Sequence, residues 1–374
     1  MNTAFAFNLR EVNGALGDLG TLLPLMLGSI AIGGLAPVPV VLGFAVFYLG
    51  TAFYYRLPIP VQPMKAVAAV ILTAGMSPLE LAIAGATIGV VLLLLGVTGW
   101  IARLNRLIPQ SVLAGLQLGL GALLALTSLS LMAEQVWIGI ATLSVLLVAM
   151  RFPRWPSVVL ALLTAWGLGY FQAASAPLID TGTAWFPALA SWPDMQSIER
   201  AMSMLVLPQL SLTVTNAIVL TTLVAGDYFG ERATHVTPAR LSISTGLANL
   251  VLTPFGALPM CHGAGGLAAH YRFGARTGTA PLLLGGALLA VACVPPQWGL
   301  GLLAGIPSAG LGALLLVAAW QLAITKRLFD SKPSCWPVIA VTAVVTVALD
   351  PFWGLIAGGV SEWGRIRWHR HRHA

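Results

Sequence analysis

Long apolar runs recur along the whole chain, separated by short stretches that carry Gly, Pro or charged residues. Each run suits a membrane helix, because about 20 mostly apolar residues cross a hydrocarbon core about 30 Å thick. Bounding the runs at Gly, Pro and charge predicts spans near 14–33, 37–55, 63–77, 79–98, 111–132, 135–150, 156–173, 207–226, 239–256, 263–274, 279–296, 300–324, 334–349 and 351–364. We therefore expect an all-α membrane protein with about 14 transmembrane spans.

Composition supports the same class. Hydrophobic residues make up 58% of the 374 positions and charged residues 8%, whereas soluble domains have about 25% charged residues. The net charge of +7 comes from basic residues scattered singly or in pairs between apolar runs, which favours the lipid bilayer rather than nucleic acid as partner. Cys261, Cys293 and Cys335 are far apart and lack CxxC spacing, so we expect no metal site, disulfide framework or cofactor.

The basic residues also predict the orientation of the spans. With a cytoplasmic N-terminus, the loop Lys and Arg fall almost entirely inside, and of the loop and tail bases only Arg200 falls outside. The acidic residues expected outside are Glu80, Glu134, Asp180, Asp194, Glu199 and Asp350. This one-sided distribution is the positive-inside pattern. We expect a bacterial inner-membrane protein with both termini cytoplasmic. The C-terminal tail WHRHRHA is expected to lie on anionic lipid rather than to bind a metal.

Two of the apolar segments are short and interrupted, and they occupy matching places in the two halves. They lie at 57–75 and 257–278. At an offset of 200 residues Gln62 aligns with His262 and Pro63 with Gly263. In each segment, prolines and residues that accept an extended backbone come before a run that can form a helix. Both segments are therefore predicted to be extended first and helical afterwards.

Seven spans per half is an odd number, so the second half crosses the membrane in the opposite orientation to the first. This predicts a 7+7 inverted repeat in which spans 3 and 10 are half-helices that meet at the midplane. Their N-termini would face a common centre, where unsatisfied N–H groups and positive macrodipole ends suit an anion. The residues expected to offer donors there are Met64, Lys65, Gly263, Ala264, Gly265 and Gly266. Small residues in membrane helices also have an ordinary explanation in close helix packing.

Three ionisable residues lie in or beside these spans, where charge is costly and therefore informative. Lys65 either binds the anion directly or pairs with Asp18 and holds the broken helix. Asp18 is expected to make a structural pair, with a coupled proton as the alternative. His262 either donates to an oxyanion or is a packed histidine bonded to a neighbouring span.

A polar stripe marks the eighth span. Gln209, Thr213 and Asn216 are spaced by four and three, so they share one helix face. A polar stripe in a membrane helix faces protein or water, and we expect Thr21 and Gln62 to complete this lining. Ser and Thr in such helices also bond back to their own carbonyls.

Four motifs carry a resemblance to a known family. GDLGTLLP at 17–24, PVQPMKAVAA at 60–69, PQLSLT at 208–213 and MCHGAGGLAAHYRFGARTG at 260–278 resemble the molybdate transporter family related to the sulfate permeases. The resemblance implies the seven-plus-seven fold shared with sulfate permeases and uracil permease. Residues 1–109 and 207–298 would form a core domain (spans 1–4 and 8–11), 110–175 and 299–374 a gate domain (spans 5–7 and 12–14), and 176–206 an extracellular loop. Sulfate permeases usually carry a regulatory domain after the last span, and we expect none here, because about ten residues follow.

The resemblance also implies a secondary transporter that takes up a tetrahedral oxyanion by alternating access, molybdate first and sulfate second. Proton coupling, uniport and exchange stay open, as does a homodimer. A nucleobase:proton symporter of the same fold would need an acidic residue near the eighth or tenth span, and the sequence offers none there. A membrane-embedded enzyme would need paired acids, whereas the acids here lie almost all at the membrane surfaces, so no enzyme is expected.

Overall fold

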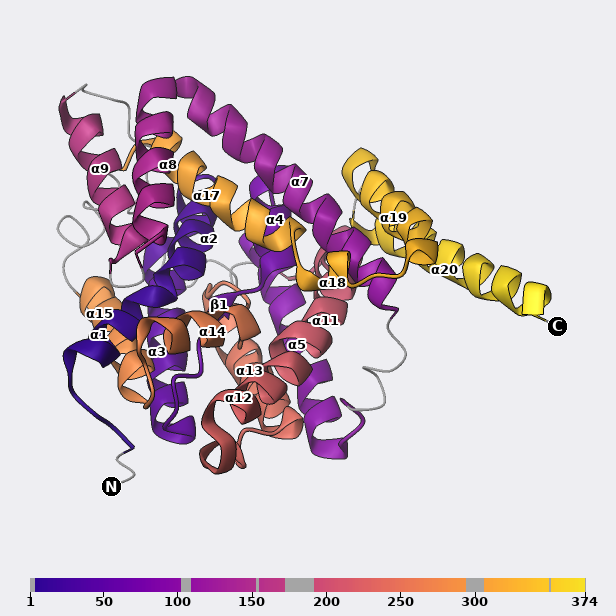
Figure 1. The fold of residues 1–374 in the computed structure, drawn as a ribbon, viewed down its shortest axis with the longest axis horizontal. Coiled ribbons are helices and arrows are strands. Elements are labelled where there is room, and N and C mark those ends of the chain that lie inside the picture. The colour runs from indigo at the N-terminus through magenta and orange to yellow at the C-terminus, as the bar shows by residue number, and fades with distance from the viewer. Residues whose placement is uncertain are drawn as a thin grey trace.

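The computed structural model describes residues 4–101, 109–152, 155–171, 192–293, 306–349 and 351–373. Within these ranges the chain is helical apart from one two-stranded sheet (Figure 1). The elements of the first half are α1 (Leu9–Gly17), α2 (Leu19–Ala31), α3 (Pro37–Tyr55), β1 (Gln62–Pro63), α4 (Lys65–Ala74), α5 (Pro78–Thr98), α7 (Gln110–Glu134), α8 (Val136–Met150) and α9 (Ser157–Phe171).

The second half repeats this order of long helices around a short strand. Its elements are α10 (Met195–Arg200), α11 (Leu207–Leu212), α12 (Thr221–Phe229), α13 (Pro238–Leu252), β2 (Met260–Cys261), α14 (Ala264–Phe273), α15 (Thr279–Cys293), α17 (Ser308–Ala323), α18 (Lys326–Phe329), α19 (Trp336–Ala348) and α20 (Pro351–His373). Two π-helical segments, Ala201–Val206 and Thr213–Leu220, join α10, α11 and α12 into one long helix.

Five helices of the described chain are long and apolar enough to cross a membrane, by length and composition. They are 37–55, 78–98, 110–134, 195–233 and 308–329, and the bent pair α1 and α2 makes a sixth. Most of the remaining apolar helices are shorter, with 10–17 residues. The chain is a multi-pass helical membrane protein, and helix length by itself does not test the predicted count of fourteen.

Three helices differ in extent from the prediction. The span predicted at 14–33 is two helices bent by 48°, with Asp18 at the junction. The helix predicted to start at 207 begins at Met195, inside the stretch predicted as an outer loop, because Asp194 caps it by accepting from Ser197 N–H at 2.8 Å. Hydrogen bonds from the side chain and the backbone N–H of Ser197 also lower the pKa of the Asp194 carboxyl from its usual range. The last helix runs on to His373.

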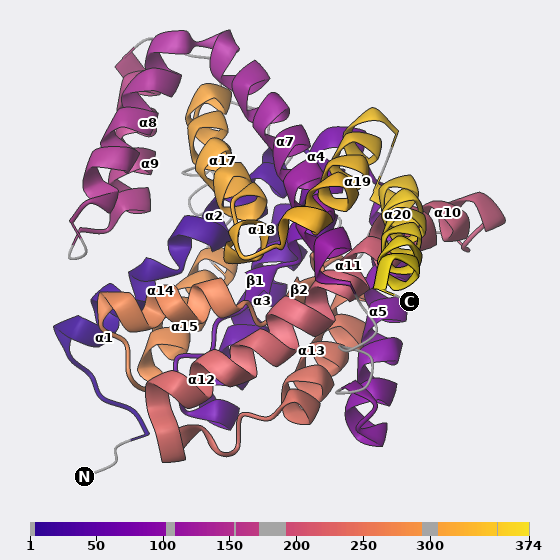
Figure 2. The ribbon, with the colours of Figure 1, turned by 45° about the vertical axis from the view of Figure 1, so that its right-hand side comes forward.

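The helices pack in two groups, and each group is built from pairs of helices in contact. In the first group α3 packs on α15, α5 on α13, and α1 on α14. In the second, α7 packs on α17 and α19, α8 on α9, and α19 on α20 (Figures 1 and 2). Close approach at the α5–α13 crossing depends on glycine, since a Cβ on Gly89 would lie 2.8 Å from Gly246 O. We refer to these groups as the first and second helix groups.

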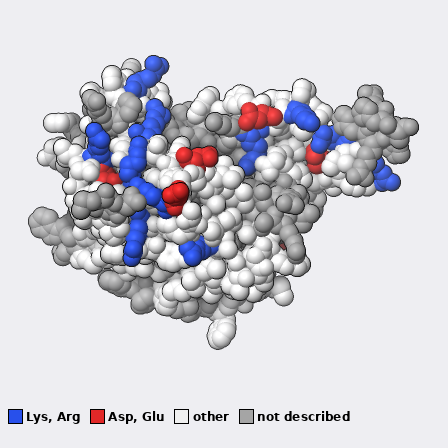
Figure 3. Space-filling model, turned by 60° about the horizontal axis from the view of Figure 1, so that its bottom comes forward, with Lys and Arg blue, Asp and Glu red and all other residues white. Residues whose placement is uncertain are grey.

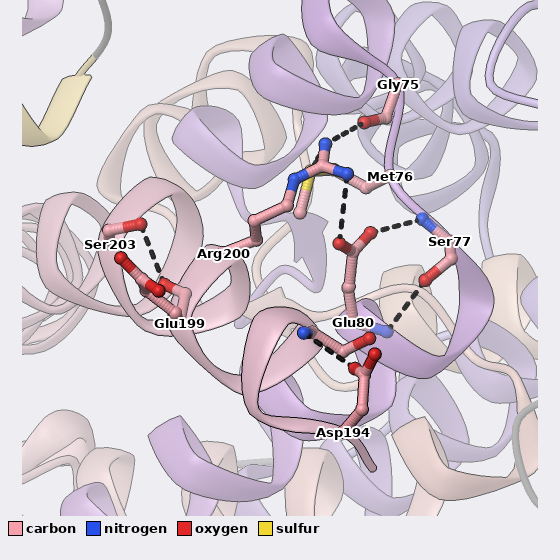
Figure 4. A network of polar contacts seen from close by, with 9 residues as sticks. Gly75, Met76, Ser77, Glu80, Asp194, Glu199, Arg200 and Ser203 are labelled. Atoms are coloured by element: carbon pink, nitrogen blue, oxygen red, sulfur yellow. Dashed lines mark hydrogen bonds and ion pairs between the residues drawn. The ribbon is translucent and has the colours of Figure 1, made fainter. Parts of the chain in front are cut away.

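Charged side chains are unevenly placed on the surface. On the face shown in Figure 3, Lys and Arg form a row at the left and a second group at the right, with fewer Asp and Glu among them. Elsewhere, Glu80 and Arg200 form an ion pair at 3.3 Å, and Arg200 also donates to Gly75 O at 3.3 Å (Figure 4). Asp194 and Glu199 lie beside this pair. Four of the residues predicted to lie on the outer side of the membrane, Glu80, Asp194, Glu199 and Arg200, therefore lie together, and Asp180 and Asp350 lie outside the described residues.

Candidate functional site

Two extended segments meet at the centre of the molecule (Figures 1 and 2). Strands β1 and β2 pair antiparallel, with Gln62 opposite Cys261 and Pro63 opposite Met260. Asn249 of α13 holds β2, because its Oδ1 accepts from Met260 N–H at 2.9 Å and its Nδ2 donates to Met260 O at 2.7 Å. Helices α4 and α14 begin directly after the strands. The prediction of two segments that are extended first and helical afterwards is confirmed, and both helices start at one place.

The N-terminus of α4 is largely occupied by protein acceptors. Gln209 Oε1 accepts from Ala66 N–H at 2.9 Å and from Val67 N–H at 3.3 Å, as an N-capping side chain does. Met64 N–H donates to Pro259 O at 2.9 Å. The N–H of Met64 is thus used within the protein, contrary to the expectation that it faces a ligand.

The N-terminus of α14, by contrast, is open. No side chain caps it, and among the described residues no protein acceptor receives the N–H of Ala264, Gly265 or Gly266. Leu267 N–H bonds to Gly263 O at 3.2 Å, so the unsatisfied donors belong to the first turn. A Cβ on Gly265 would meet no atom within 4 Å, which leaves these N–H groups accessible from that side.

A cavity of about 880 Å³ lies against both helix starts. From the first helix group and the long helix 195–233 it is lined by Gln62, Pro63, Lys65, Gln209, Leu212, Thr213, Ala217, Leu220, Cys261, Gly263, Ala264 and Gly265. From the second helix group and the segment around α18 it is lined by Gln110, Ser111, Gln117, Gln321, Leu322, Thr325, Arg327, Asp330, Ser331, Lys332, Cys335 and Arg365. The cavity therefore separates the two helix groups, and each contributes one wall.

The structure brings together part of the predicted site. Gln62, Lys65, Gln209, Thr213, Gly263, Ala264 and Gly265 line the cavity, whereas Met64, His262, Gly266, Thr21 and Asp18 do not. Thr21 Oγ1 lies 3.5 Å from Gln321 Oε1, on the helix α17 that forms part of the opposite wall. The side chain of Asn216 lies outside the described part of the structure.

His262 is a packed histidine and not a cavity residue. Its side chain is fully buried, Nδ1 lies 2.9 Å from Pro60 O, and Nε2 lies 2.8 Å from Ser244 Oγ. The ring also packs edge-on to Tyr55. Because both nitrogens already have protein partners, His262 has no N–H left for an oxyanion, and the alternative of a histidine bonded to a neighbouring span describes it.

The alternative in which Lys65 pairs with Asp18 is wrong. The Asp18 carboxylate accepts from Tyr48 Oη at 2.7 Å and from Gln62 Nε2 at 2.5 Å. Among the described residues, no carboxylate lies within 4.0 Å of Lys65 Nζ. Asp18 is therefore structurally bonded, as expected, but to other partners, and Lys65 lines the cavity without a carboxylate partner among the described residues.

Sequence reasoning missed the wall that the second helix group supplies. Gln117 Oε1 accepts from Arg327 at 3.1 Å, and both side chains line the cavity. Polar residues within the apolar run 111–132, Gln117 among them, were the available signal. No spacing rule relates them to β1 or β2, because these contacts join segments more than a hundred residues apart in sequence.

Two solved structures with this fold are described as a bicarbonate transporter and an anion transporter. The transmembrane domain of the cyanobacterial bicarbonate transporter BicA has a TM-score of 0.69 at 16% identity, covering 93% of this chain and 96% of that domain. Murine Slc26a9, an anion transporter solved in the inward-facing state, has a TM-score of 0.71 at 13% identity, covering 97% of this chain and 69% of that chain. The chain thus has the fold of these transporters.

Sequence comparison is more specific. Residues 10–124 and 201–322 match the family described as molybdate transporter of MFS superfamily. Molybdate transporter 2 of Arabidopsis thaliana is 30% identical over 89% of this chain and 82% of its own length. Molybdate transporter 1 of the same plant is 29% identical over 96% of this chain and 88% of its own length. Together with the paired half-helices, these matches show that the chain belongs to the molybdate transporter family.

Proposed function

We propose that the chain is a secondary transporter that takes up molybdate, held in the cavity between the starts of α4 and α14. The observation that carries the proposal is the open first turn of α14, whose unsatisfied N–H groups face a cavity that Lys65 also lines. Backbone donors at a helix N-terminus and a nearby ammonium are a site for an oxyanion. The ligand residues proposed are Lys65, Gln62, Gln209, Thr213, Gly263, Ala264 and Gly265.

The charges in this arrangement balance. A dianion needs about two elementary charges of compensation, and two helix N-termini together offer about one. Lys65 supplies the second, since no carboxylate of the described chain neutralises it. Uncompensated charge at this depth would cost several kcal/mol. His262 is not needed for the balance and has no free N–H to contribute.

Sulfate is the second candidate, because it is also a tetrahedral dianion and would meet the same donors. A nucleobase is disfavoured by the lining of the cavity. A nucleobase would need an acidic residue near a half-helix. Asp330 is the single carboxylate among the described residues that line the cavity, and it belongs to the wall around α18.

The packing of helices supports the 7+7 inverted repeat. If α3, α5, α13 and α15 are spans 2, 4, 9 and 11, the repeat exchanges 2 with 9 and 4 with 11. The contact of α3 with α15 then maps onto that of α13 with α5, and both are extensive in the structure. We propose that the first helix group is a core domain (1–109 and 207–298), that the second is a gate domain (110–175 and 299–374), and that 176–206 lies outside the membrane.

The one-sided basic residues support cytoplasmic termini in a bacterial inner membrane. A homodimer is proposed as the assembly. Alternating access then consists of movement between the two helix groups, which wall the cavity from opposite sides.

Competition in proteoliposomes tests the proposed substrate. Purified protein should take up labelled molybdate, and unlabelled tungstate and molybdate should block this uptake more strongly than sulfate. Uracil should have no effect. Equal block by sulfate and molybdate would move the assignment to a general oxyanion transporter. Block by uracil alone would contradict the proposal.

A further inference from the structure

A fully buried polar cluster lies directly behind β1. It consists of Asp18 at the junction of α1 and α2, Tyr48 of α3, Gln62 of β1 and His270 of α14, each exposed by 1% or less. Of these, only Gln62 also lines the cavity. The charge balance of the anion site does not use Asp18 or His270, so a buried acid and a buried histidine remain unexplained.

The hydrogen-bond partners of His270 determine where its ring proton must be. Nδ1 lies 2.8 Å from Gly14 O, a carbonyl oxygen that can only accept, so Nδ1 carries the hydrogen. In a neutral ring, Nε2 then presents a lone pair. Nε2 has no hydrogen-bond partner among the described residues and lies 3.7 Å from Asp18 Oδ2.

An ionised Asp18 also presents lone pairs, so a neutral His270 and a charged Asp18 would place two acceptors face to face in a buried space. Such an arrangement is unfavourable, because a buried acceptor without a donor costs about 1–3 kcal/mol. One added proton resolves it. The proton lies either on His270 Nε2, giving an imidazolium–carboxylate pair, or on Asp18 Oδ2, whose O–H then points at Nε2.

Gln62 connects this pair to the cavity. Its Nε2 donates to Asp18 Oδ1, while its Oε1 has no hydrogen-bond partner among the described residues and lies against Gly263. A Cβ on Gly266 would collide with both Gln62 Nε2 and Asp18 Oδ1. The cluster therefore touches the first turn of α14, the same turn whose N–H groups face the cavity.

We propose that Asp18 and His270 form a proton-binding site linked through Gln62 to the anion cavity, and that anion uptake is coupled to the proton held there. The inference rests on the proposed anion transport and adds its driving ion. Without the proton, the cluster bears a net negative charge beside the anion site and opposes a dianion. With the proton, which enters from the outer side and leaves to the cytoplasm, the cluster is neutral.

Other titratable groups around the cluster do not share this arrangement. Lys65 and Cys261 lie on the cavity side, and His262 has both ring nitrogens bonded. At the far end of α1, Glu11 Oε1 accepts from Arg276 N–H at 2.9 Å. On the other side of α14, Tyr271 stacks on Tyr228 of α12. Among the titratable groups named here, two facing acceptors occur at Asp18 and His270.

Proton movement and anion binding can be measured separately. In weakly buffered proteoliposomes with an entrapped pH dye, molybdate added outside should acidify the lumen, and equilibrium binding in detergent should tighten as pH falls. One linked proton gives at most about tenfold per pH unit. Asp18→Asn and His270→Gln should lose the acidification and flatten the pH dependence. His235→Gln, a half-buried histidine bonded to Tyr55 O at 2.7 Å, should retain both.

Each outcome is decisive. The proposal is overturned if His270→Gln or Asp18→Asn keeps wild-type acidification and pH dependence, or if wild-type uptake needs sodium and ignores pH. If both variants fail to fold, Tyr48→Phe serves instead. It removes a donor to the Asp18 carboxylate, so the midpoint of the pH dependence should move to higher pH, and an unmoved midpoint would contradict the proposal. Absence of molybdate binding at every pH would contradict the proposed substrate itself. This outcome is distinguishable from a failure of the proposed proton coupling.

Discussion

At the residue scale, Lys65 carries the largest share of the proposed charge balance. Its ammonium lines the cavity, and no described carboxylate lies within ion-pair distance of it. Lys65→Gln should weaken molybdate binding by about tenfold or more, which corresponds to about 1.4 kcal/mol. Lys65→Arg should keep part of the affinity. The control is Lys332→Gln, a lysine of the opposite wall, for which we expect less than about a threefold change.

Gly265 tests the backbone donors in the same way. A side chain here would extend into open space against the first turn of α14, so Gly265→Leu should reduce molybdate affinity by about tenfold or more without loss of folded protein. Gly286 of α15 is the matched control, since its Cβ would also meet no atom within 4 Å but it does not line the cavity. If Gly265→Leu and Gly286→Leu bind molybdate equally well, the anion does not lie at α14.

The residues also show where sequence reasoning stops. Gly263, Gly265 and Lys65 could be predicted because helix starts follow from local Pro and Gly. The partners of Asp18 could not, because Gln62 and Tyr48 reach it from β1 and α3. Charge alone suggested Lys65 as the partner of Asp18. The actual hydrogen bonds of Asp18 depend on how β1 and α3 pack against the junction of α1 and α2.

At the element scale, Arg200 links α10, the first part of the long helix 195–233, to neighbouring elements. Its guanidinium bonds to Glu80 of α5 and to Gly75 O at the C-terminus of α4, the helix whose start faces the cavity (Figure 4). Ser77 and Glu80 form a capping box at the start of α5. The ion pair thus connects α10 to α5, and the hydrogen bond connects it to the C-terminus of α4.

Arg200→Gln should lower the thermal midpoint by about 1–3 °C. The Arg200 side chain is 44% exposed, so solvent screens the pair and its contribution is about 1 kcal/mol or less. Glu80 keeps the Ser77 N–H bond at 2.7 Å, which limits the loss. The check is a melting curve in detergent for Arg200→Gln, Glu80→Gln and the double variant. Additive effects would show that the two side chains do not interact, and Glu199→Gln controls for loss of an exposed charge on the same helix.

Helix bounds were predicted correctly where the apolar pattern determines them. They were missed where the hydrogen bonds of a single polar residue determine them. Helices α3, α5 and α7 follow their apolar runs closely. The bend at Asp18 and the start at Met195 do not, since one depends on tertiary hydrogen bonds and the other on the Asp194 cap. Hydropathy reports neither kind of bond.

At the scale of the whole molecule, the cavity with its two walls depends on how the helices pack. The sequence placed both half-helices because each carries its own breakers. It did not place the wall containing Gln117 and Arg327, whose contact spans 210 positions of the chain. Matching segments in the two halves therefore predict the cavity wall at the half-helices better than the wall that the second helix group supplies.

Orientation in the membrane is the prediction that most directly tests the whole-molecule proposal. Gln196 is exposed between Asp194 and Glu199, and Thr234 is exposed beside Arg232. With the native cysteines replaced by alanine, Gln196→Cys should react with an impermeant maleimide added to intact cells, whereas Thr234→Cys should react only after lysis. The basic residues favour this assignment because Lys and Arg are retained on the cytoplasmic side. Labelling of both positions from the same side would refute the inside-N topology and, with it, the opposed entry of the two half-helices into the membrane. Labelling of both in detergent controls for accessibility of each thiol.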